Sequence, residues 1–151
     1  MAALSPEQFT SAIKPRAILY FSDQIALKTP NPHYFICVGS NYDNELIFSC
    51  CTSQFNSVLT LIERKRFPSS TLVYISKDDN ENPFTKNTYV NCNEYFPYFL
   101  SELWQLYVRG ILSFHGELPL NSFGQILTRF MDSTQIEQEL KEGLPTIDDF
   151  P

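Results

Sequence analysis

The residues of this sequence best suited to proton transfer or phosphate binding lie where a predicted β-hairpin begins and where it ends along the chain. His33 begins an apolar run at 33–39, and Thr52-Ser53-Gln54 follows a second run at 45–51. Imidazole titrates near neutral pH and can move a proton, whereas hydroxyl and amide groups can hold a phosphate or the edge of a base. Both sets also have an ordinary structural interpretation, as a half-exposed histidine and a polar strand end.

The two apolar runs are expected to pair as antiparallel strands. The run at 33–39 is nearly all aromatic, β-branched or sulfur-bearing, and 41–44 supplies turn residues before the return strand. Antiparallel pairing brings the end of the second strand beside the start of the first. The hairpin therefore predicts that His33 lies near Thr52.

Basic residues occur in two places from which they could reach a phosphate. Lys14 and Arg16 directly precede a strand predicted at 17–21, and Arg64-Lys65-Arg66 ends a helix predicted at 56–67. The second cluster either binds an anion or complements the helix C-terminus. The net charge of −6 opposes non-specific attraction to a polyphosphate, so nucleic acid binding requires a local basic patch.

The cysteines show no pattern of a metal or redox site. All four lie within apolar runs and are predicted to be buried, reduced thiols: Cys37, Cys50, Cys51 and Cys92. The sequence contains no Gly-rich phosphate loop, HExxH, GxSxG or EF-hand pattern, and no metal or cofactor is predicted. No apolar leader or run of membrane-spanning length occurs, so we expect a cytoplasmic location and no membrane partner.

The pattern of elements predicts one α+β domain over 1–151. Four or five short strands and an N-terminal helix from Ser5 to about Ile13 are expected in the first part of the chain, with a curled core at about 14–95. The part at about 100–143 is predicted to be helical, with helices at 101–109, 120–131 and 134–142. We expect a small curled antiparallel sheet with the C-terminal helices packed outside it.

The order of these motifs resembles that of the MazF/PemK-like toxin family. The similarity spans roughly 14–110, and the matching segments are Pro32-His33-Tyr34-Phe35-Ile36-Cys37-Val38, Cys50-Cys51-Thr52-Ser53-Gln54 and Thr88-Tyr89-Val90-Asn91-Cys92-Asn93. The resemblance implies an SH3-like barrel and metal-independent cleavage of single-stranded RNA. In the family an Arg enters the second strand and a Thr or Ser ends the next, so the resemblance gives the hydroxyl role to Thr52 and puts His33 at the Arg position. The family's Gly-Asp opening before the first strand is replaced by Lys14-Pro15-Arg16.

The first functional hypothesis is a toxin-like endoribonuclease of a toxin–antitoxin system. Its partners would be single-stranded RNA, an antitoxin protein and a second copy of the chain. His33 would transfer the proton while Thr52 and Arg16 hold phosphate oxygens. The further RNA-binding residues of this hypothesis are Lys14, Ser53, Gln54, Arg64 and Arg66.

The second hypothesis is a non-catalytic SH3-like interaction module. Its aromatic groove would bind a peptide or an adapter protein. The aromatic residues assigned to this groove are Tyr89, Tyr95, Phe96 and Tyr98.

Overall fold

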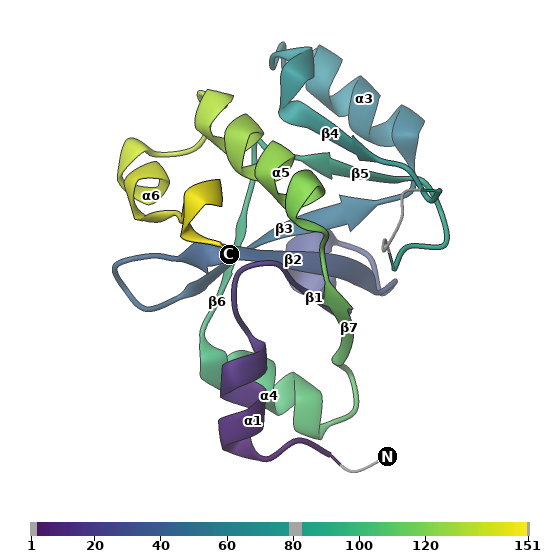
Figure 1. Ribbon diagram of the computed structural model, residues 1–151. Coiled ribbons are helices and arrows are strands. Elements are labelled where there is room, and N and C mark those ends of the chain that lie inside the picture. The colour runs from purple at the N-terminus through teal and green to yellow at the C-terminus, as the bar shows by residue number, and fades with distance from the viewer. Residues whose placement is uncertain (1–2, 79–82, 151) are drawn as a thin grey trace.

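An antiparallel sheet with helices on both of its faces forms the centre of the computed structural model (Figure 1), which describes residues 3–78 and 83–150. The strands are β1 (Ala17–Phe21), β2 (His33–Ser40), β3 (Leu46–Thr52), β4 (Leu72–Ile75), β5 (Thr88–Asn91), β6 (Phe96–Tyr98) and β7 (Ser113–Glu117). The helices are α1 (Pro6–Ala12), α2 (Gln24–Leu27), α3 (Phe55–Arg64), α4 (Leu100–Val108), α5 (Leu120–Asp132) and α6 (Gln138–Gly143), with 3-10 turns η1 (Ser69–Thr71) and η2 (Ile147–Asp149).

The sheet is seven-stranded, in the order β4-β5-β3-β2-β1-β7, and β6 pairs with β3 beside this path. All of the strand pairs are antiparallel, so the predicted α+β class and antiparallel sheet are confirmed. In the described part of the chain these pairings do not close into a barrel. Instead of a β4–β7 pair, α5 follows β7 and packs against β4.

Two strands lie where the sequence pattern predicts none. The sequence pattern predicts a helical part at about 100–143, but within it Ser113–Glu117 forms β7 and pairs with β1. Its short polar and glycine-containing sequence gives no period-2 signal, and Gly116 has a φ of 82° that breaks regular strand geometry. The three-residue strand Phe96–Tyr98 contains Pro97 and is likewise formed by its pairing with β3.

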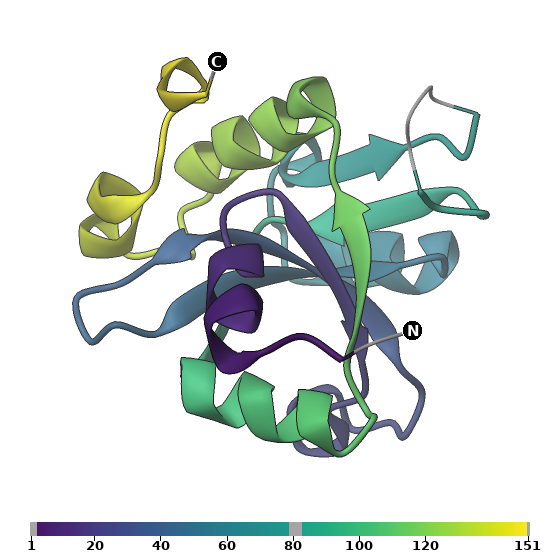
Figure 2. The ribbon, with the colours of Figure 1, turned by 60° about the horizontal axis from the view of Figure 1, so that its bottom comes forward.

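Side chains on opposite faces of the sheet form two cores. We call the core beneath α5 and α6 the upper core and the core beside α1 and α4 the lower core (Figures 1 and 2). In β2, Ile36 and Val38 belong to the upper core, whereas Phe35 and Cys37 belong to the lower core. Because β2 is covered on both faces, its near-continuous apolar sequence has a direct packing reason.

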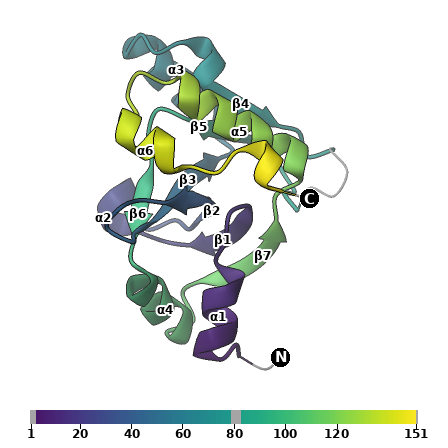
Figure 3. The same cartoon turned by 60° about the vertical axis from the view of Figure 1, so that its left-hand side comes forward.

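The chain after α6 closes the upper core from outside. Figure 3 shows this C-terminal segment running back alongside α5. Phe150 contacts Phe123 of α5 with ring centroids 5.5 Å apart. In the part of the chain that the structure describes, no helix has both the length and the apolar character needed to cross a bilayer.

A buried polar network ties the end of α5 to the β4–β5 region. Asn93 Nδ2 donates to Thr71 Oγ1 at 2.7 Å and to Asn91 Oδ1 at 2.9 Å, and Ser133 Oγ donates to Asn93 Oδ1 at 2.7 Å. All four residues are buried, so each group depends on the others for hydrogen bonding.

Asn93→Ala should lower the free energy of unfolding by about 2 to 4 kcal/mol, because it leaves buried hydroxyl and amide groups without partners. Urea unfolding followed by circular dichroism measures the change. Asn121→Ala, at an exposed position of α5, is the matched control and should change stability by less than about 0.5 kcal/mol. Equal effects of the two substitutions would contradict the role given to the network.

Candidate functional site

A cavity of about 520 Å³ lies where β2 begins and β3 ends. Its lining combines polar side chains with aromatic rings. The lining residues are Tyr20, Thr29, Asn31, Pro32, His33, Tyr34, Cys51, Thr52, Ser53, Gln54, Phe84, Thr85, Lys86 and Thr88. Four of the residues singled out from the sequence, His33 and the segment Thr52-Ser53-Gln54, are therefore brought together here.

The juxtaposition of His33 and Thr52 follows from the strand register. Phe35 is opposite Cys50 in the β2–β3 pair, and extending this register by two residues places His33 opposite Thr52. Both residues line the cavity, so their predicted proximity is confirmed.

A backbone contact fixes which nitrogen of His33 is available. Nδ1 lies 3.0 Å from the carbonyl oxygen of Asn31. Because a carbonyl oxygen only accepts hydrogen bonds, this contact assigns the proton of the neutral ring to Nδ1. Nε2 then carries the lone pair and can accept a proton from a bound molecule.

The segment after β3 turns directly into a helix. The Gln54 N–H donates to Thr52 Oγ1 at 3.0 Å, which ends the strand, and α3 begins at Phe55. No side chain caps the N-terminus of α3 in the described structure. The positive end of this helix therefore adjoins the Thr52 and Ser53 hydroxyl groups, an arrangement favourable to an anion.

The charge of the cavity differs from that of the whole chain. Lys86 is a cation of the lining, and no described lining residue is acidic, although the chain has a net charge of −6. Three further hydroxyl groups, those of Thr29, Thr85 and Thr88, add hydrogen-bonding capacity. This lining is suited to a ligand with both negative charge and polar edges.

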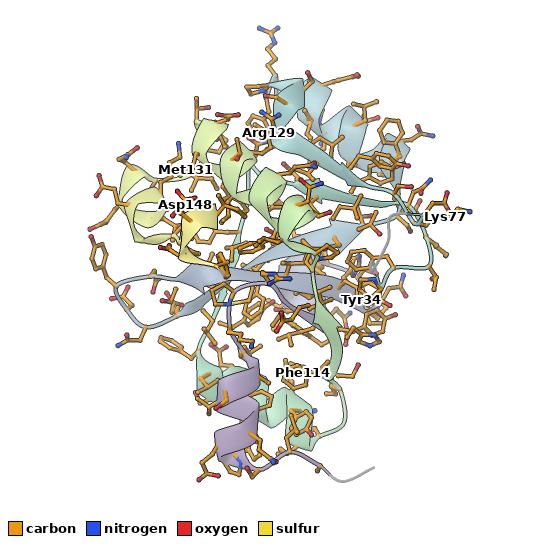
Figure 4. The ribbon with its side chains drawn as sticks, in the orientation of Figure 1. Tyr34, Lys77, Phe114, Arg129, Met131 and Asp148 are labelled. Atoms are coloured by element: carbon orange, nitrogen blue, oxygen red, sulfur yellow. The ribbon has the colours of Figure 1, made fainter. Side chains whose placement is uncertain are left out.

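Aromatic rings form one wall of the cavity. The Tyr34 ring contacts Tyr20 at 4.6 Å and Phe84 at 5.0 Å between centroids, and His115 of β7 packs against Tyr20 and Tyr34 at 5.4 and 5.2 Å. Burial, followed by the charges of Tyr20 and Cys51, raises the pKa of the Tyr34 hydroxyl above its usual value, so this group stays protonated. Figure 4 shows Tyr34 on the same side of the view as Lys77.

Sequence reasoning did not find this wall. Tyr20 and Tyr34 lie in strands whose apolar pattern indicates only core packing, and His115 lies in a strand that the pattern did not reveal. The missing information is the strand order, which places β7 beside β1.

Cys51 lines the cavity as a thiol rather than a thiolate. Burial raises its pKa well above the ordinary value, and the charges of Cys50 and Cys92 raise it further. Since the thiolate is the reactive form, Cys51 is unsuited to nucleophilic attack. All four cysteines are free, and three are buried while Cys50 is half-buried. Over residues 3–78 and 83–150, no group of three or more His, Cys, Asp or Glu side chains is placed to hold a metal ion.

Arg16 and Lys14 do not join this site. They precede β1, whereas the cavity lies near the opposite end of that strand. Arg16 Nε donates to the Leu118 carbonyl at 2.9 Å, and both cations lie within 4 Å of a Glu117 carboxylate oxygen, Lys14 at 3.2 Å and Arg16 at 3.7 Å. The predicted meeting of Arg16 with His33 is therefore wrong: the hydrogen bonds of Arg16 fasten β1 to the end of β7.

Arg64 and Arg66 also lie away from the cavity, at the opposite end of α3 from Gln54. The N–H of Arg66 donates to Glu63 O at 3.1 Å and that of Phe67 to Ile62 O at 3.0 Å, which is a Schellman ending. Arg66 has a φ of 58°, in the left-handed region that favours glycine. Arg66 is therefore the left-handed residue that ends α3, which is a structural role.

Arg66→Gly should raise the free energy of unfolding by about 1 kcal/mol, because glycine adopts the left-handed conformation without the penalty of a side chain. Denaturant unfolding is the measurement. Arg64→Gly, one of the last residues within α3, removes the same charge but should lower stability by about 0.5 to 1 kcal/mol. Destabilisation of similar size in both variants would show that the Arg66 side chain has a different role.

The aromatic residues assigned to a peptide groove are dispersed. Tyr98 is buried in the lower core and donates to Asp23 Oδ2 at 2.6 Å, with Phe96 packed nearby. Tyr95 packs against the upper core and donates to the Glu137 carboxylate at 2.9 Å, while Tyr89 contacts Phe55. These four residues do not form one groove because Phe96 and Tyr98 face the lower core, Tyr95 packs against the upper core, and Tyr89 lies in β5.

No protein-family model matches this chain, and no curated protein matches its sequence.

Proposed function

We propose that this chain binds single-stranded RNA at the cavity and cleaves it without a metal ion, as a toxin-like endoribonuclease. The observation that carries the proposal is the meeting, in one cavity, of an imidazole with an available Nε2 and a cluster of phosphate-binding groups. The resemblance of the motifs to MazF/PemK-like toxins supports the same function. An antitoxin partner, a homodimer, an SH3-like relationship of the curled sheet and a cytoplasmic location belong to this proposal.

In the reaction, Nε2 of His33 takes the proton from a ribose 2′-hydroxyl group. The 2′-oxygen attacks the adjacent phosphorus, and the bond from phosphorus to the 5′-oxygen of the next nucleotide breaks. The imidazolium returns its proton to the leaving 5′-oxygen. The products are a 2′,3′-cyclic phosphate and a 5′-hydroxyl end, and His33 returns to its neutral form, so only the RNA is changed by the reaction.

The phosphate oxygens would be held by the groups that face them across the cavity. Thr52 Oγ1 accepts the Gln54 N–H and still has its own hydrogen to donate, and Ser53 offers a second hydroxyl. Lys86 supplies the charge that the sequence-based hypothesis gave to Arg16. The uncapped N-terminus of α3 adds to the positive potential.

His33→Gln should lower the rate of RNA cleavage by about 10² to 10⁴, because the side-chain amide cannot accept the proton. Cleavage of unstructured RNA oligonucleotides is measured in EDTA, with the cyclic phosphate product identified by mass spectrometry.

Circular dichroism and urea unfolding should show that the His33→Gln variant keeps the fold. Thr52→Ala should weaken RNA binding by roughly tenfold through loss of a hydrogen bond to a charged oxygen. Wild-type protein, purified free of other proteins, that neither cleaves nor binds a varied set of single-stranded RNAs would overturn the proposal.

A further inference from the structure

Three aromatic rings lie in contact on the outer side of the β4–β5 pair. Tyr89 contacts Phe55 with centroids 4.9 Å apart and stacks on Tyr74 at 5.4 Å with an interplanar angle of 27°. Phe55 is 41% exposed and Tyr74 is 52% exposed. We call Phe55, Tyr74 and Tyr89 the aromatic platform.

The platform is continuous with the cavity. Thr52 of the cavity is opposite Tyr89 in the β3–β5 pair, and Tyr89 is opposite Tyr74 in the β5–β4 pair. Directly opposed residues share one face of a sheet, with neighbouring strands about 4.8 Å apart. Phe55 follows Gln54, which also lines the cavity. The three rings thus begin one strand away from the Thr52 hydroxyl group.

Two lysines border the platform on the side of the cavity. Lys77 follows β4 by two residues and Lys86 precedes β5 by two, and the Lys77 N–H donates to Asn87 Oδ1 at 3.0 Å. Figure 4 shows Lys77 at the outer edge of this part of the sheet. Asp78 is the acidic neighbour of Lys77. The platform therefore combines exposed rings with nearby cations, as do proteins that bind single-stranded nucleic acids.

We infer that the aromatic platform stacks the bases of a single RNA strand that continues out of the cavity, an inference that rests on the proposed function. Every base has a π-face, so stacking on the platform contributes affinity without fixing the sequence. Bases within a duplex are already stacked and paired, and their faces cannot reach these rings. The platform thus selects unpaired RNA longer than the segment held in the cavity.

Anisotropy with fluorescent 2′-O-methyl RNA tests this inference, because the blocked 2′ position prevents cleavage. Wild-type protein should bind a decanucleotide more tightly than a trinucleotide, and a hairpin stem of equal length more weakly than the decanucleotide. Tyr74→Ala should reduce the advantage of the decanucleotide by about tenfold, from the loss of one stacked base. Tyr74→Phe keeps the ring and should retain the advantage.

The matched control is Tyr42→Ala, in the turn between β2 and β3, where an equally large side chain is 73% exposed outside the platform. It should bind both lengths as the wild-type protein does. Suppose that the wild-type protein binds RNA, and that Tyr74→Ala keeps the same advantage for the decanucleotide as Tyr74→Phe. The role of the platform is then overturned, whereas the proposed function is not.

Wild-type protein that binds no RNA of either length overturns both proposals. Binding of a proline-rich peptide that depends on Tyr74, in a protein with no length-dependent RNA binding, identifies the rings as a protein-recognition surface and overturns the inference. Each of these outcomes therefore overturns either the inference about the platform alone or that inference together with the proposed function.

Discussion

The backbone hydrogen bonds of β3 determine where the other strands can lie. Along one edge β3 pairs with β2, and along its other edge Leu46–Phe48 pair with β6 before Cys51 and Thr52 pair with β5. Because buried N–H and C=O groups must find partners, a strand covered on both faces needs neighbours on both edges. The short strand β6 satisfies the beginning of that second edge and β5 satisfies its end. The two halves of the sheet are joined through this one strand.

This arrangement explains why polar chemistry collects at one end of β3. The strand cannot continue past Thr52 because Gln54 turns the chain into α3, and β2 begins opposite that point at His33. Apart from the buried Ser49, the buried side chains of both faces are apolar or cysteine up to Phe35 and Cys51, so the hydroxyl, amide and imidazole groups of the cavity gather where this packing ends. Across the sheet, Thr52 lies opposite Tyr89, and Tyr89 lies opposite Tyr74. Cavity and aromatic platform are two consequences of one set of strand pairs.

The parts that sequence reasoning found are those specified by neighbouring residues. The β2–β3 hairpin, α3 and α5 carry strong local patterns, and the hairpin alone brings His33 to Thr52. Arg16 could not be placed because its partners, Glu117 and Leu118, lie about a hundred positions away, where a strand with no local signal ends. Lys86 could not be placed at the site because its position depends on the strand order, which brings β5 beside β3. The closed barrel was inferred from a resemblance of motifs, whereas closure depends on pairing between the two outermost strands.

The cavity and the aromatic platform both depend on the proposal that RNA binds at the end of β3 beside His33. Its most direct test is an NMR titration of isotope-labelled protein with a 2′-O-methyl single-stranded decanucleotide, following backbone amides and the two histidine rings. The largest shift changes should occur at His33, Thr52, Ser53 and Lys86, with smaller ones at Tyr74 and Tyr89. The absence of shift changes, or shift changes that gather instead at the separate cavity lined by Asn41 and Glu137, would contradict this proposal.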